Sequence, residues 1–71
     1  MATTWRAPVR FVVKEHHNGV PFVVIEQLSG DLGPVKKLLI SFDLEDGIDL
    51  AAAKDLARLL ESKIPRLAVT D

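Results

Sequence analysis

The sequence has no cysteine and no tyrosine, and it has one tryptophan and one methionine. Without cysteine the chain can form neither a disulfide nor a thiolate zinc site. Short domains often rely on such devices, because a chain of this size buries only about 60% of the surface that it exposes when unfolded. We therefore expect well-packed elements or oligomerisation to supply the stability that a small core lacks.

The sequence also lacks long apolar runs and a strong net charge. No stretch approaches the ~20 apolar residues that span a bilayer, and the first ten residues lack the apolar run of a signal peptide. The formal net charge is −1, and lysine and arginine are scattered along the chain. These features predict a cytoplasmic protein with no membrane partner and no long-range field that attracts nucleic acid.

Residues 49–64 carry the clearest structural pattern in the chain. On a helical wheel one arc is apolar and the opposite arc is polar, as expected for an amphipathic helix that covers an apolar surface. Asp49 is a favourable N-cap, and Pro65 disfavours helical geometry at Ile64. The apolar arc contains Ala52, Ala53, Leu56, Ala57, Leu59, Leu60 and Ile64.

Two strands are predicted before this helix, at residues 9–17 and 20–28, because both stretches are rich in β-branched residues. Asn18-Gly19 between them is typical of a hairpin turn. A two-residue loop sets Val13 opposite Val24. A three-residue loop with Gly19 as a bulge instead sets Arg10 opposite Glu26. A slip of one residue exchanges the two faces of a strand, so the buried face remains open.

Residues 35–44 predict a third strand, with Leu38, Ile40, Phe42 and Leu44 on its buried face. The expected fold is α+β: a three-stranded antiparallel β-meander followed by one C-terminal amphipathic helix packed on one sheet face. Residues 9–64 form this β-β-β-α domain. Residues 1–8 are expected to be an extended arm, and 65–71 a tail in preference to a fourth edge strand.

No motif predicts catalytic, cofactor-binding or metal-binding residues. His16 and His17 are adjacent on a strand and point to opposite faces, so one surface can use only one of them. The acidic residues around Gly47 do not follow the calcium-loop pattern, and helix capping explains them better. Glu15 and Glu26 are expected at solvated positions of the sheet. An enzyme is therefore less favoured than a binding protein, and no cofactor is expected.

A surplus of apolar strand residues predicts the function. One helix covers one face of a three-stranded sheet, and the other face keeps an apolar patch of the kind that marks interfaces. We expect a protein-interaction module that forms a homodimer or binds another protein. The alternatives are a nucleic-acid-binding domain that uses the sheet face, and a small enzyme or ligand-binder with its site at a dimer interface. The predicted interface residues are Trp5, Val12, Val23, Ile25 and Leu39.

Overall fold

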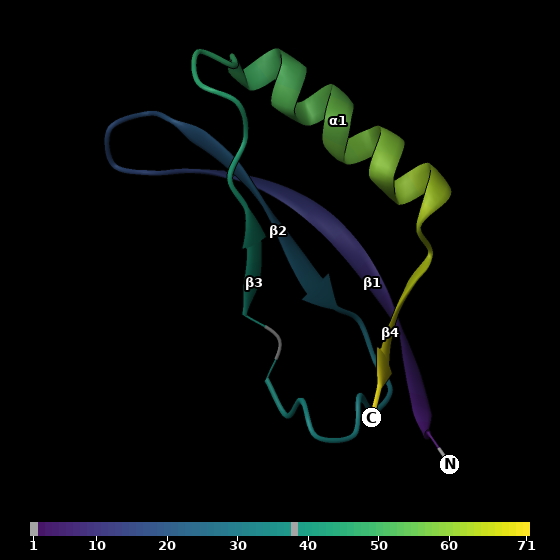
Figure 1. Cartoon of the computed structure of the whole chain (residues 1–71). Coiled ribbons are helices and arrows are strands. Elements are labelled where there is room, and N and C mark those ends of the chain that lie inside the picture. The colour runs from purple at the N-terminus through teal and green to yellow at the C-terminus, as the bar shows by residue number, and fades with distance from the viewer. Residues whose placement is uncertain (1, 38) are drawn as a thin grey trace.

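The fold was analysed in a computed structural model that describes residues 2–37 and 39–71. The described residues form one antiparallel sheet and one helix that lies across it (Figure 1). The elements in chain order are β1 (Thr4–Glu15), β2 (Pro21–Gln27), β3 (Ile40–Phe42), α1 (Leu50–Lys63) and β4 (Arg66–Thr70).

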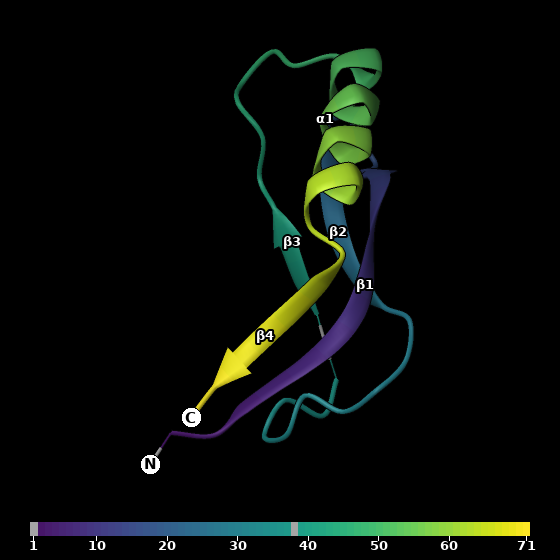
Figure 2. The same cartoon turned by 90° about the vertical axis from the view of Figure 1, so that its right-hand side faces the viewer.

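The α+β prediction is confirmed, but the sheet has four strands and not three, in the order β3-β2-β1-β4. The predicted tail forms β4, which pairs with the first half of β1, in the predicted arm. Leu67 lies opposite Ala7 and Val69 opposite Trp5, so the two chain ends cover each other's apolar side chains. Figure 2 shows this two-stranded part extending beyond the helix.

The β1–β2 hairpin has the three-residue register. Arg10 lies opposite Glu26 and forms a salt bridge with it, with 2.6 Å between the guanidinium and the carboxylate. Gly19 has a φ of 84°, a conformation that glycine adopts readily, and its N–H donates to the carbonyl of His16. Opposite charges face each other in this register, which favours it over the two-residue alternative.

Helix α1 begins and ends as the sequence predicts. The Asp49 side chain accepts a hydrogen bond from the N–H of Ala52 at 2.7 Å, and the helix ends before Pro65. Its two buried residues, Ala53 and Ala57, are small and let the helix approach the sheet closely. The hydrophobic core consists of Val9, Phe11, Val23, Ile25 and Ala57.

Residues 28–37, between β2 and β3, pack against the first half of β1, which the helix does not reach. Leu32 is fully buried in this segment, and Gly33 lies against the indole of Trp5. Because this segment turns at Leu32 and Val35 to form its own bridge, β3 begins later than the predicted residue 35.

The predicted burial of Ile40 and Phe42 is wrong. Both lie on the sheet face that bears the core, opposite Ile25 and Val23, but 43% and 40% of their surfaces remain exposed. The reason is that α1 packs on β1 and β2 and does not extend over β3. Leu44 does pack against the core, and Leu38 lies outside the described residues.

Candidate interaction surfaces

The structure does not bring the five predicted interface residues together. Val23 and Ile25 are buried in the core beneath α1, so their assignment to the uncovered sheet face is corrected. Trp5 is half-buried against Gly33 of the same chain. Val12 is half-buried on the opposite sheet face, and Leu39 is 80% exposed beside β3. Leu39 and, in part, Val12 therefore remain exposed, whereas Val23 and Ile25 do not.

Two apolar side chains of β3 are exposed where the helix–sheet layer ends. They are Ile40 and Phe42, with 43% and 40% of their surfaces exposed. Leu59 of α1 is also exposed, but it lies about 140° around the helix from the midpoint of the buried Ala53 and Ala57 and is therefore turned away from the sheet. We call Ile40 and Phe42 the open side of the core. Apolar patterning alone does not find it, because the same pattern fits a surface covered by this chain or by a partner.

The outer edge of β3 borders the open side. Backbone groups of alternate residues in an antiparallel strand point to alternate edges. His16 N–H donates to Val20 and Leu28 N–H donates to Pro8, so the even-numbered residues of β2 bond toward β1. Ser41 lies opposite Val24, one of these residues. The N–H and carbonyl of Ser41 therefore face away from β2, at the edge of the sheet.

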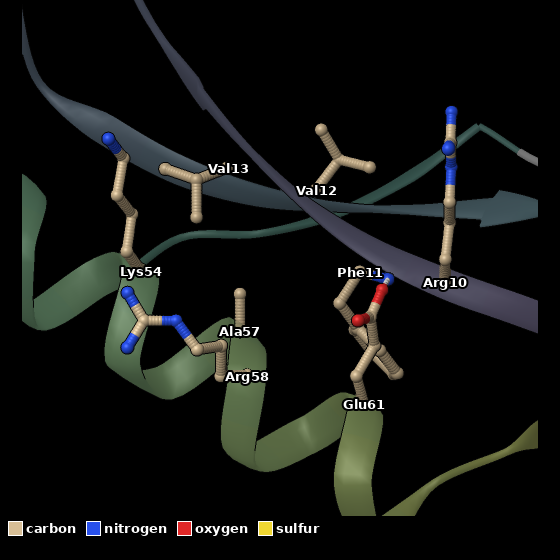
Figure 3. Close-up of a pocket in the computed structure, with 8 residues that line it drawn as sticks. All are labelled: Arg10, Phe11, Val12, Val13, Lys54, Ala57, Arg58 and Glu61. Atoms are coloured by element: carbon tan, nitrogen blue, oxygen red, sulfur yellow. Dashed lines mark hydrogen bonds between the residues drawn. The ribbon is translucent and has the colours of Figure 1, made fainter.

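A groove lies along the other edge of the sheet, between β1 and α1, with a volume of about 360 Å³ (Figure 3). Its floor is apolar, from Phe11, Val13 and Ala57, and cationic side chains stand around it. We call it the edge groove. Its lining residues are Arg10, Phe11, Val12, Val13, Lys54, Ala57, Arg58 and Glu61.

Glu61 occupies one position of the β1 edge in this groove. Its carboxylate accepts a hydrogen bond from the backbone N–H of Phe11 at 3.1 Å, as Figure 3 shows. Two residues earlier in β1, and nearer to β4, the N–H of Val9 donates to the carbonyl of Pro65 at 3.3 Å. A side chain of the helix thus continues the hydrogen bonding of β1 beyond the point where β4 begins.

The sheet face opposite α1, which we call the outer face, has a basic character. Strand residues alternate between faces. The residues of β1 that lie between and beside the buried Ala7, Val9 and Phe11 therefore point to this face. Among the strand residues that the structure describes, Glu26 is the one carboxylate there, and it is paired with Arg10. The basic residues of the outer face are Arg6, Arg10, Lys14 and Arg66.

The two histidines lie at the end of the β1–β2 hairpin. The ring of His16 stacks on Phe22, with 4.1 Å between ring centroids. Within residues 2–37 and 39–71, no three histidine or carboxylate side chains are close enough together to hold a metal ion. Over the same residues, α1 is too short and too polar to cross a bilayer.

Comparison of the chain with protein families, with curated proteins and with solved structures finds no match.

Proposed function

We propose that the protein is a protein-interaction module that forms a homodimer through the edge of β3. The observation that supports this proposal is the open side of the core. Ile40 and Phe42 stand on the same sheet face as the buried Val23 and Ile25, yet the described residues leave 43% and 40% of their surfaces exposed. The ring of Phe42 stacks on that of Phe11, so a partner that covered Phe42 would extend the existing core.

The edge of β3 is complementary to itself. If two copies of β3 pair antiparallel about Ser41, each Ile40 lies opposite Phe42 of the other copy, on the face that bears both helices. The three residues of β3 carry no charge, so this pairing brings no like charges into direct opposition. Such a contact obeys a two-fold axis, which is the commonest symmetry of homo-oligomers.

Stability is a second reason for a dimer. Small domains without disulfides or structural metals have thin stability margins, and this chain has no cysteine. Joining two sheets edge to edge would bury the open side in both copies and pair the outward N–H and carbonyl of both Ser41 residues. The dimer would therefore gain both apolar burial and hydrogen bonds.

Sedimentation of the Ser41→Pro variant tests the proposed contact. Proline removes the N–H that faces the free edge and leaves the hydrogen bonds between β3 and β2 in place. We expect the wild type to sediment at about twice the chain mass of 7.8 kDa at micromolar concentration, and Ser41→Pro to sediment as a monomer. Ser41→Ala keeps the N–H and should remain a dimer.

Two outcomes would contradict the proposal. A wild type that stays monomeric up to about 100 μM would exclude a stable homodimer, and a Ser41→Pro variant that remains a dimer would exclude the β3 edge. Circular dichroism of each variant checks that the fold is intact.

Nucleic-acid binding is the second candidate function, and the basic outer face supports it. Arg6, Lys14 and Arg66 stand there beside the Arg10–Glu26 pair. Binding through such a surface releases counterions and weakens steeply with salt. A double Arg6→Ala, Arg66→Ala variant should then bind duplex DNA more weakly and with a shallower salt dependence. DNA binding that is absent at low salt would remove this candidate.

A further inference from the structure

The edge of β1 is incompletely paired. β4 pairs with β1 as far as Pro8. Beyond it, the N–H of Val9 donates to the carbonyl of Pro65, and the N–H of Phe11 donates to the carboxylate of Glu61. By the alternation that holds along this strand, Val13 and Glu15 also direct their backbone groups to the same edge. No strand lies beyond them among the described residues. This part of the edge offers hydrogen bonds to an additional strand.

The edge groove gives that strand a place to lie. Figure 3 shows β1 along one side and α1 along the other, with Phe11, Val13 and Ala57 at the base. A strand added to a sheet edge presents side chains alternately to the two faces. Every second side chain of an added strand would therefore enter the space between β1 and the helix and contact this apolar base.

We propose that the edge groove binds an extended, acidic segment of a partner protein as an additional strand beside β1. The main chain of the segment bonds to Val13 and Glu15 and continues the line of β4. Apolar side chains of the segment enter the groove, and its carboxylates face the surrounding cations. Recognition by strand addition combines main-chain hydrogen bonds with pockets for alternate side chains.

The charges of the groove decide the class of partner. Lys54 and Arg58 line it from α1, against the single carboxylate of Glu61, which is already bound to the Phe11 N–H. Arg10 also lines the groove, but its guanidinium is paired with Glu26 on the outer face. Arg58 also pairs with Asp55, but both side chains are more than two-thirds exposed, so this ion pair is easily rearranged. An acidic segment complements this surface. A second copy of the chain does not, because two-fold pairing of β1 edges would juxtapose both sets of cations.

This interaction is separate from the proposed homodimer. The dimer uses β3, at one edge of the sheet, whereas the edge groove lies beside β1 near the other edge. A Ser41→Pro monomer should therefore bind the acidic segment as the wild type does. Failure of either proposal leaves the other open to its own test.

Selection from a library of random octapeptides displayed on phage tests the proposal. We expect the wild-type chain to enrich peptides in which apolar residues alternate with aspartate or glutamate. Synthetic versions should bind at least tenfold more weakly to a Lys54→Glu, Arg58→Glu variant. The matched control is Lys36→Glu, Lys37→Glu, which changes the net charge equally at exposed positions outside the groove and should retain the affinity.

Amide hydrogen exchange shows whether a selected peptide adds as a strand. The N–H groups of Val13 and Glu15 should become protected when the peptide binds, whereas those of Arg10 and Val12, which already bond to β2, should change little. Several outcomes would overturn the proposal: no enriched peptide, enriched peptides without acidic residues, equal binding by both charge-reversal variants, or protection at Ser41 in place of Val13. Tight binding of a single-stranded oligonucleotide in the groove, without binding of any peptide there, would also overturn it, in favour of a nucleic-acid site.

Discussion

Individual residues at the far end of the sheet show how closely the covering segment fits. Gly33 has a φ of 63°, and a Cβ atom added to it would collide with the indole of Trp5. Gly33→Ala should therefore destabilise the protein by more than the ~1–2 kcal/mol that a left-handed backbone costs alanine, because Trp5 must also move. Urea unfolding followed by the fluorescence of this single tryptophan measures the loss.

Gly19→Ala provides the matched control. Gly19 also has a positive φ, of 84°, but no atom lies within 4 Å of the position that its Cβ would occupy. Its replacement should cost only the backbone contribution, and the emission spectrum of Trp5 should not change. Equal losses in the two variants would show that Trp5 does not pack on Gly33 as described.

Among the elements, α1 shows the difference between an apolar arc and a buried face. Leu60 packs against the core, whereas the adjacent Leu59 is 55% exposed. In the Ser41→Pro background, which removes the proposed dimer contact, Leu60→Ala should cost roughly 2–3 kcal/mol. Leu59→Ala should stay within about 0.5 kcal/mol, as surface substitutions do. Chemical denaturation of both variants measures the two values, and a larger loss at Leu59 would mean that the helix is rotated about its axis.

The same elements show which parts of the fold could be predicted from the sequence. The ends of α1 and the turn at Gly19 depend on neighbouring residues, namely Asp49, Pro65 and the glycine itself, so local patterns predicted them. The pairing of β4 with β1 joins Thr4 to Thr70, and a five-residue strand carries too little local pattern to indicate a partner so distant in sequence.

The surfaces were harder to predict for a related reason. Alternating apolar residues indicate that Ile40 and Phe42 share a face with the core, and they do. Whether that face is covered depends on how far α1 reaches across the sheet, which no local pattern determines. The edge groove arises in the same way, because it lies where the pairing of β4 with β1 stops, at Pro8, and where Glu61 of α1 accepts a hydrogen bond from the N–H of Phe11.

At the scale of the whole molecule, the proposed dimer makes stability depend on protein concentration. Folding and association are then one equilibrium, and mass action favours the folded dimer as concentration rises. A tenfold increase in concentration contributes about 1.4 kcal/mol per dimer, or roughly 0.7 kcal/mol per chain. For a domain of this size, that free energy raises the unfolding temperature by about 3–5 °C.

The unfolding temperature is measured by circular dichroism at about 5, 50 and 500 μM, which gives two tenfold steps in concentration. The wild type and Ser41→Ala should show the rise at each step. Ser41→Pro should unfold at one temperature throughout, because its edge cannot donate the hydrogen bond to a second β3. An unfolding temperature of the wild type that is constant across this range would mean that the open side, Ile40 and Phe42, stays uncovered in the free protein. The chain would then fold as a monomer, and those side chains would be left for a different protein to cover.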